Sequence, residues 1–242
     1  MKIKILGVIP ARYGSSRFPG KPLAKIFDKP MIQHVYEQVK LSKVLNNVIV
    51  ATDDEKILNC VKDFGGNAMM TPSDLPNGTT RAELVSRNFD VDAVINIQGD
   101  EPLLDSIMID EVAEMLESGN YCATLCRNLN DDRENPNIVK VVLSQNNFAL
   151  YFSRSLIPYE RNKINPPVYQ HIGIYGYTKE FLKKYISLPE TPLSNAESLE
   201  QLKILEHDYK IKVGITKSQK ISIGVDTPED LEQVRKILQC KS

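Results

Sequence analysis

Tryptophan is absent from this sequence, cysteine is scarce, and no long hydrophobic run occurs. The four cysteines form no Cys-x-x-Cys pair and have no neighbouring histidine. This spacing argues against a zinc site and is typical of reduced, buried thiols in a cytosolic protein. The apolar segment over residues 2–10 is followed at once by Arg12 and is too short for a signal peptide or a membrane span. We therefore predict a cytoplasmic protein without a membrane role.

An excess of charge of either sign is also missing. The 242 residues contain 30 Lys and Arg against 31 Asp and Glu, a formal charge of -1, whereas a general nucleic-acid-binding protein is usually basic. Hydrophobic residues make up 42% and charged residues 25% of the chain, as in an ordinary soluble globular protein. A chain of this length buries roughly 70–75% of its unfolded surface, so it needs no disulfide or metal to fold. We expect one domain over residues 1–242.

Short apolar segments alternate with amphipathic ones in the first half of the chain. Strands are expected over residues 3–9, 48–51, 67–70 and 93–97. Helices are expected over residues 31–39, around 57–61, and over 80–89 and 105–117. This alternation predicts an α/β fold with a mainly parallel sheet, helices on both faces and right-handed crossovers.

The second half is richer in expected strands and less regular. A hairpin is expected from strands over 139–143 and 149–153, followed by a proline-punctuated loop and a strand over 171–178. We interpret residues 145–190, approximately, as a β-rich insertion that forms a subdomain or a dimer surface. The remaining expected elements are a helix over 194–207, strands over 211–216 and 221–225, and a helix over 227–238.

A basic loop follows the first expected strand. Residues 11–25 carry no acid and a local charge of +4 from Arg12, Arg17, Lys21 and Lys25. Small residues that let backbone N–H groups approach an anion lie between these cations: Gly14, Ser15, Ser16 and Gly20. The loop is not a Walker A motif, because its glycine spacing is one residue too long and Pro22 replaces the Ser or Thr. A solvated basic loop is the alternative, but the composition favours a phosphate-binding site.

Two aspartates directly follow expected strands. Asp100 comes after the strand over 93–97, and Asp226 comes after the strand over 221–225. In an open α/β sheet, ligands bind at the carboxyl ends of the strands. Most other acids of residues 98–117 fit an exposed helix face, and the last helix has its own capping residues in Thr227, Pro228 and Asp230. Asp100 and Asp226 are thus free to bind Mg²⁺ beside nucleotide phosphates.

A later group of polar residues lies on one expected strand and one expected helix. His171 and Tyr175 are four residues apart and share a strand face. Glu197, Glu200 and Gln201 follow on the helix, although Glu197 also fits a capping box with Ser194. Arg81 follows a Gly-Thr-Thr turn and offers a cation for a carboxylate, which is weak evidence alone.

These residues belong to segments that occur together in a known family. In chain order the segments are PARYGSSRFPGKPL (10–23), VATD (50–53), NIQGDEP (96–102), ALYFSR (149–154), HIGIYGY (171–177), LEQL (199–202) and VDTPED (225–230). Together they closely resemble the 3-deoxy-manno-octulosonate (Kdo) cytidylyltransferases, over residues 3–238. The first segment indicates only a sugar nucleotidyltransferase, whereas ALYFSR and HIGIYGY narrow the resemblance to the Kdo-type branch.

The resemblance implies a fold, a reaction and a set of site residues. The fold is a three-layer, Rossmann-like nucleotidyltransferase fold of the GT-A type, usually in a homodimer built through the β-rich insertion. The reaction joins CTP to Kdo with Mg²⁺, giving CMP-Kdo for lipopolysaccharide biosynthesis and pyrophosphate. The implied catalytic residues are Lys21, Asp100 and Asp226, the two aspartates being the metal ligands. The implied nucleotide-binding residues are Ala11, Arg12, Arg17, Lys21 and Gln98, and the implied sugar-binding residues are Arg81, His171, Tyr175, Glu197 and Gln201.

One stretch departs from the family pattern. Many members have an acidic residue where this chain has Thr80, and the following Ala82-Glu83 also differs. The sugar acid is therefore open among Kdo, 8-amino-Kdo and a sialic-type nonulosonate. Outside catalysis, a nucleotide-binding regulator or a structural protein of the same fold are the rival hypotheses, but neither has a use for both aspartates.

Overall fold

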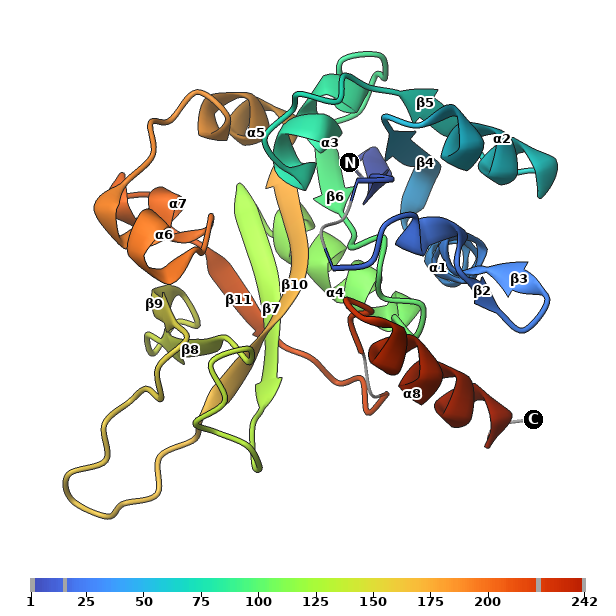
Figure 1. Ribbon diagram of the computed structural model, residues 1–242. Coiled ribbons are helices and arrows are strands. Elements are labelled where there is room, and N and C mark those ends of the chain that lie inside the picture. Colours follow the sequence, from blue (N-terminus) through green and yellow to red (C-terminus); the bar gives the residue numbers. More distant parts are fainter. Residues whose placement is uncertain (1–2, 15–16, 221–222, 241–242) are drawn as a thin grey trace.

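The computed structural model describes residues 3–14, 17–220 and 223–240. Within these ranges, nine strands form one sheet. Its main path runs through β11 (Lys212–Ile215), β7 (Cys122–Asn128), β10 (Tyr169–Thr178), β6 (Ala93–Asn96), β1 (Ile5–Ala11), β4 (Leu45–Thr52) and β5 (Ala68–Met70) (Figure 1). Neighbouring strands are parallel except at β10, which is antiparallel to both β6 and β7. The mainly parallel sheet predicted from the sequence is therefore confirmed.

Helices cover both faces of this sheet because its strands are apolar on both sides. In β1, Ile5 and Ile9 point into one hydrophobic cluster, whereas Leu6 and Val8 point into the other. The first cluster is covered by α1 (Met31–Lys40), α2 (Glu55–Asp63) and α4 (Ser106–Glu117). The second is covered by α3 (Gly78–Ser86), α5 (Lys179–Tyr185) and α7 (Leu202–Glu206), and α6 (Pro192–Glu197) packs against α7. The result is the expected three-layer arrangement.

A third, smaller cluster attaches the C-terminal helix to the N-terminal loops. Val225, Leu231 and Val234 pack against Ile26, Met31 and Leu103. Helix α8 (Pro228–Gln239) thus meets the start of α1 and strand β2 (Lys25–Ile26). Strand β2 follows the 3-10 turn η1 (Lys21–Leu23) and pairs with β3 (Lys29–Pro30). In Figure 1, α8 lies beside the edge of the sheet where β1 and β6 end.

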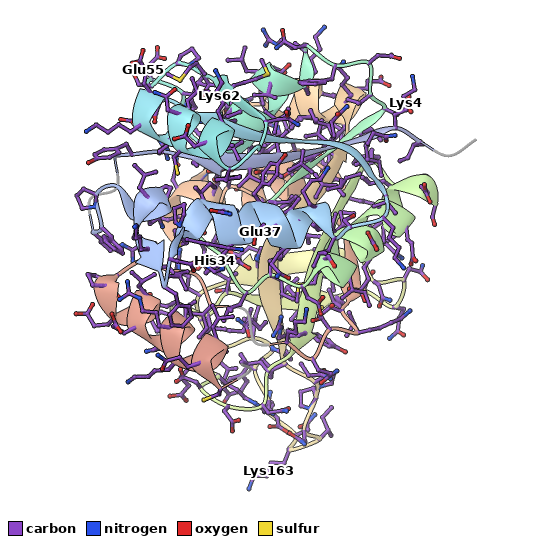
Figure 2. The ribbon with its side chains drawn as sticks, turned by 90° about the vertical axis from the view of Figure 1, so that its right-hand side faces the viewer. Lys4, His34, Glu37, Glu55, Lys62 and Lys163 are labelled. Carbon is purple, nitrogen blue, oxygen red and sulfur yellow. The ribbon has the colours of Figure 1, made fainter. Side chains whose placement is uncertain are left out.

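Beyond the main sheet, the expected hairpin forms from β8 (Lys140–Leu143) and β9 (Ala149–Ser153), with β8 pairing to the start of β10. The following residues, 154–168, contain no helix or strand and project away from the body of the protein. Lys163 marks the far end of this projection in Figure 2. The boundaries of a separate insertion over 145–190 stay a prediction, since β10 is an integral strand of the sheet and α5 also falls in this range.

Two expected elements differ in the structure. The helix predicted over 194–207 is interrupted at Ser198, which has a left-handed φ of 52°, so that α6 and α7 are separate. The strand predicted over 221–225 is wrong for residues 223–225, which are irregular, and residues 221–222 lie outside the described ranges. Strand β7 and helix α5 were not predicted from the sequence.

Two further expectations concern cysteines and membranes. Cys122 and Cys126 are buried, as predicted, whereas Cys60 is half-buried and Cys240 is exposed, so the prediction of four buried thiols was wrong for those two. Among the described residues, all four thiols are free. None of the helices in the described ranges has the length and apolar character needed to cross a bilayer.

Candidate active site

Two adjoining clefts open at the edge where β1 and β6 end. The first has a volume of about 330 Å³, and its lining includes Ala11, Arg17, Lys21 and Asp100. The second has a volume of about 400 Å³ and lies toward α3, β10 and α7. Arg12, Gly78 and Gln98 line both clefts. The structure therefore places a cation-rich cleft and a second, mostly uncharged cleft in direct contact.

The basic loop forms one wall of the first cleft. Its end is fixed by Gly20, which has a left-handed φ of 70° and donates its backbone N–H to the carbonyl of Tyr13 at 2.8 Å. A Cβ on Gly20 would lie 3.1 Å from the Tyr13 ring, so glycine suits this position both sterically and conformationally. This turn brings Lys21 to the cleft together with Arg12 and Arg17. Two residues of the predicted phosphate-binding loop, Ser15 and Ser16, lie outside the described ranges.

The two aspartates predicted from the sequence meet at Lys21. The Lys21 Nζ atom lies 2.6 Å from Asp100 Oδ2 and 3.1 Å from Asp226 Oδ1. Arg17 forms a second ion pair with Asp226, at 2.9 Å. Burial disfavours the charged form of Lys21, but the two carboxylates outweigh it and raise the pKa of its ammonium group. Lys21 and Asp100 are 79 positions apart in the sequence, and Asp100 and Asp226 are 126 positions apart, yet the three form one charged cluster.

Backbone contacts hold the second carboxylate in place. The Val225 N–H donates to the carbonyl of Asp100 at 2.8 Å, which joins the two aspartate-bearing segments directly. Helix α8 begins with a capping box between Thr227 and Asp230, as predicted. The Asp230 carboxylate also accepts the backbone N–H of Asp226 at 3.0 Å. The Asp226 side chain takes no part in the capping box and is paired with Lys21 and Arg17 instead, as expected of a carboxylate that the cap does not need.

The paired carboxylates fit a divalent cation. The Lys21 ammonium shows that one positive centre can contact Asp100 and Asp226 at the same time. Mg²⁺ commonly takes one or two carboxylates, with substrate phosphates and water filling its remaining positions. No cluster of three or more His, Cys, Asp or Glu suited to a metal occurs in the described ranges, so a metal held here would depend on oxygens of a substrate.

Gln98 and its neighbours form the boundary between the clefts. The Gln98 Nε2–H donates to the carbonyl of Gly173 at 3.1 Å, next to an irregularity in the pairing of β10 with β7. Gly99 allows the loop to pass against β1, because a Cβ there would lie 2.4 Å from the Pro10 carbonyl oxygen. Gln98 is exposed, and its position on both linings suits contact with a ligand that spans the clefts.

The second cleft contains three of the five residues that the resemblance assigns to the sugar acid: His171, Tyr175 and Gln201. The His171 and Tyr175 rings lie 5.3 Å apart on one face of β10, as their spacing predicted. Desolvation lowers the pKa of His171 to about 3, so its imidazole is neutral at physiological pH. His171 therefore offers a hydrogen-bonding group and no positive charge to a ligand.

Arg81 does not line either cleft, so the structure does not bring it together with the other residues that the resemblance assigns to the sugar acid. Its side chain is 0% exposed, forms an ion pair with Asp53 at 3.2 Å and hydrogen-bonds Thr71. Burial lowers the pKa of this guanidinium, although Asp53 partly offsets the effect. These two partners lie just after β4 and β5, so Arg81 joins α3 to that end of the sheet.

Glu197 is also directed away from the second cleft. Its carboxylate accepts hydrogen bonds from Ser153 Oγ at 2.6 Å and from the Arg154 N–H at 2.8 Å. These bonds outweigh the effect of burial and lower the pKa of Glu197. Its expected contact with the sugar acid is therefore corrected to a structural contact between α6 and β9. The predicted capping box with Ser194 is likewise not formed, since helix α6 begins at Pro192.

Glu200 occupies the cleft position expected of Glu197. The break at Ser198 turns the chain so that Ser198, Leu199, Glu200 and Gln201 all line the second cleft. Burial raises the pKa of the Glu200 carboxyl. The sequence signal for this break is weak, because serine rarely adopts the left-handed conformation. The sequence therefore predicted a continuous helix over 194–207, which gave no indication that the chain changes direction at Ser198.

The residues that depart from the family pattern lie outside both linings. Thr80 donates its hydroxyl to the Asn77 side chain at 2.9 Å and completes the start of α3. Glu83 is buried and forms an ion pair with Arg87 at 2.9 Å. Thr79 and Asn96, which were not predicted as site residues, also line the second cleft. Asn96 could have been noticed as the polar residue that ends an apolar strand.

A cation-rich cleft with paired carboxylates, joined to a neutral polar cleft, suits a reaction between a polyphosphate and a polar small molecule. Comparison with known proteins agrees with this geometry. Residues 6–211 match the family described as cytidylyltransferase, so the chain belongs to the cytidylyltransferase family of nucleotidyltransferase enzymes.

Its relatives define the branch within that family. The chain is 50% identical to the 3-deoxy-manno-octulosonate cytidylyltransferase of Thermodesulfovibrio yellowstonii, covering 97% of this chain and 98% of that one. It is 49% identical to the 8-amino-3,8-dideoxy-manno-octulosonate cytidylyltransferase of Shewanella halifaxensis, covering 93% and 94%. A solved structure of CMP:2-keto-3-deoxy-manno-octonic acid synthetase complexed with CTP superposes with a TM-score of 0.94 at 41% identity, covering 99% and 100%. The Kdo-type branch predicted from the sequence is therefore confirmed.

Proposed function

We propose that this protein transfers the cytidylyl group of CTP to 3-deoxy-manno-octulosonate, giving CMP-Kdo and pyrophosphate. The observation that carries this proposal is the position of Lys21 between Asp100 and Asp226, in a cation-rich cleft that opens onto the neutral second cleft. The printed names of the T. yellowstonii relative and of the CTP-bound structure support CTP and Kdo as the substrates. The product serves lipopolysaccharide biosynthesis.

The first cleft would hold the nucleotide. Three cations of this cleft would bind the triphosphate: Arg12, Arg17 and Lys21. Ala11 and Gln98 line the same cleft and would contact the base. The anomeric hydroxyl of the sugar attacks the α-phosphorus, the bond to the β-phosphate oxygen breaks, and the hydroxyl proton passes to solvent. No covalent enzyme intermediate is required. Positioning and charge stabilisation supply the catalysis, with Lys21 offsetting the charge that develops on pyrophosphate.

Asp100 and Asp226 would hold Mg²⁺ in this site. Bound Mg²⁺ would neutralise phosphate charge and favour the ionised form of the attacking hydroxyl. The two aspartates are prepared for this role, because the Val225–Asp100 backbone bond fixes their segments relative to one another. Lys21 would leave the carboxylates and turn to the phosphates when the nucleotide binds.

The second cleft would hold the sugar acid. His171, Tyr175 and Gln201 keep the role that the resemblance implies, and Glu200 joins them in place of Glu197. A second candidate substrate is 8-amino-3,8-dideoxy-manno-octulosonate, because the Shewanella halifaxensis relative with that printed activity is almost as similar to the chain as the T. yellowstonii relative. The Glu200 carboxylate is a suitable partner for an amino group.

Dimerisation and location complete the proposal. The projecting segment exposes Tyr159 by 89% and Ile164 by 77%, and Leu150 of the neighbouring strand β9 is 61% exposed. Exposed apolar side chains of this size suit an interface between two copies, so we propose a homodimer through this segment. We also propose a cytoplasmic location, which agrees with four unpaired thiols among the described residues.

The proposal is tested by a pyrophosphate-release screen. The purified protein is mixed with Mg²⁺, one of CTP, UTP, ATP or GTP, and one of Kdo, 8-amino-Kdo or a sialic-type acid. We expect release with CTP and Kdo, or with CTP and 8-amino-Kdo if the second candidate is correct. A well-folded protein that releases no pyrophosphate from CTP with any of these acids would refute the function.

A further inference from the structure

Asn96 is the last residue of β6 and lies at the floor of the second cleft. It is 5% exposed, so the surrounding protein shields its amide almost completely. In the antiparallel register of β6 and β10 it lies directly opposite Tyr175, whose side chain lines the same cleft. Helix α3 closes over it, because a Cβ on Gly78 would lie 3.8 Å from Asn96 Nδ2. The amide is therefore enclosed between α3, β10 and the second cleft.

A chain of hydrogen bonds fixes which way this amide points. The Thr79 hydroxyl donates to Glu200 Oε2 at 3.5 Å, because a carboxylate can only accept when ionised. Thr79 Oγ1 is thereby left as an acceptor, and it takes a hydrogen bond from Asn96 Nδ2 at 3.3 Å. The reverse orientation of the amide would place its oxygen, which has no hydrogen, against an oxygen whose proton is already used. Asn96 Oδ1 must therefore face away from Thr79.

That oxygen has no donor. Among the described residues, Asn96 Oδ1 is buried and makes no hydrogen bond. Buried polar atoms are nearly always paired in native proteins, and an unpaired one destabilises the fold. An unpaired acceptor that lines a ligand-sized cleft indicates a partner that arrives with the ligand. An amide oxygen can only accept a hydrogen bond, so the partner that it needs is a hydrogen-bond donor.

We propose that Asn96 Oδ1 accepts a hydrogen bond from a donor group of the bound sugar acid, and that Asn96 thereby helps to select the substrate. The donor is a hydroxyl group of the sugar chain or, in the 8-amino substrate, its ammonium group. This inference rests on the proposed function, since it takes the sugar acid as the occupant of the second cleft. It adds a specificity residue to those that the resemblance supplied.

The test compares wild type with Asn96→Leu, which keeps the branched shape and removes both hydrogen-bonding atoms. Initial rates at saturating CTP are measured with Kdo, 8-amino-Kdo and Kdo analogues that each lack one hydroxyl. We expect kcat/KM for the preferred acid to fall about 5–10-fold, the range of a lost neutral hydrogen bond. The KM for the sugar acid should rise, while the KM for CTP should stay unchanged.

The analogues decide whether the hydrogen bond is the cause. In wild type, one analogue should lose about 5–10-fold in kcat/KM relative to the parent acid, and Asn96→Leu should lose little further with that analogue. If the 8-amino group is the donor, wild type should have a higher kcat/KM with 8-amino-Kdo than with Kdo, and Asn96→Leu should lose most of this difference. If Asn96→Leu discriminates among all these acids as wild type does, the proposal is wrong, even when its overall rate is low.

Two controls separate this outcome from others. Val94→Ala alters the same face of β6 outside the clefts and should leave the discrimination unchanged. Asn96→Ala provides a smaller replacement if Asn96→Leu does not fold, as judged by its thermal unfolding, and the same loss of discrimination is expected. A wild-type protein without activity on any acid refutes the proposed function, whereas an active wild type with unaltered discrimination in both variants refutes only the role of Asn96.

Discussion

Replacing Lys21 with methionine would separate two effects of its charge. Methionine keeps most of the length of the side chain but cannot pair with Asp100 or Asp226, which Lys21 contacts at 2.6 and 3.1 Å. In the free protein a divalent cation must displace the ammonium from these carboxylates. The Lys21→Met protein should therefore bind Mn²⁺ more tightly than wild type when CTP is absent, although it should turn over more slowly.

Both magnitudes follow from the geometry. The carboxylate side chains are 27% and 44% exposed, so solvent screens the two ion pairs and together they contribute about 1–2 kcal/mol. Losing this competition should tighten Mn²⁺ binding about 5–30-fold. During catalysis the missing cation no longer offsets the charge on pyrophosphate, and the turnover number should fall about 10²–10³-fold.

Two assays measure these effects independently. Electron paramagnetic resonance follows free Mn²⁺ during a titration of the nucleotide-free protein, and pyrophosphate release gives kcat and the KM for CTP. Asp100→Asn is the control for the first assay, because it removes a ligand and should weaken Mn²⁺ binding. Equal Mn²⁺ affinity in wild type and Lys21→Met would refute the competition, and an unchanged CTP profile would refute the triphosphate role of Lys21.

Three further predictions address the remaining site residues. Asp100→Asn should lower kcat about 10²–10³-fold with the same far-ultraviolet circular dichroism as wild type; near-normal turnover would contradict the metal role. Glu200→Gln should raise the KM for the sugar acid about fivefold or more. Glu197→Gln should mainly lower the free energy of unfolding, by about 1–2 kcal/mol, because Glu197 accepts two hydrogen bonds. A raised KM in Glu197→Gln with an unchanged KM in Glu200→Gln would instead place Glu197 in the sugar site. His171 has a folded-state pKa of about 3, below its unfolded value, so the unfolded state alone gains a proton as the pH falls below about 6.5. Stability should therefore drop by about 1–2 kcal/mol between pH 7.5 and pH 5, and denaturant unfolding of His171→Gln should show a smaller drop.

The lengths of the apolar runs and the turn residues that end them were enough to predict most of the sheet. Buried parallel strands such as β1 and β4 consist of continuous apolar runs, and those runs end at turn residues. Strand β7 was not predicted, because its segment CATLCRN combines apolar and polar residues without a regular alternation. It becomes a strand by pairing with β10 and β11, which lie far away in the sequence. Local patterns do not contain such long-range pairing.

The same distinction applies to the candidate site. Lys21 and Asp100 were predictable because they follow β1 and β6, whose ends share one edge of the sheet. Asp226 was predicted from an expected strand that is irregular over residues 223–225; the bond from the Val225 N–H to the Asp100 carbonyl joins its segment to this edge instead. Arg81 and Glu197 were misplaced because a resemblance gives positions along the chain and not the direction of a side chain. Arg81 turns inward to Asp53, and Glu197 is redirected by the left-handed Ser198. Side-chain direction depends on tertiary packing that the sequence does not display.

The bond between Val225 and Asp100 has a consequence for the synthesis of the protein. All strands of the main sheet lie before residue 216, so a nascent chain can complete its sheet and much of its core before Asp226 leaves the ribosome. The second carboxylate arrives only when α8 docks against Ile26 and Leu103. If Asp226 is needed for catalysis, as proposed, a chain assembled in this order would gain activity only when its last helix is in place.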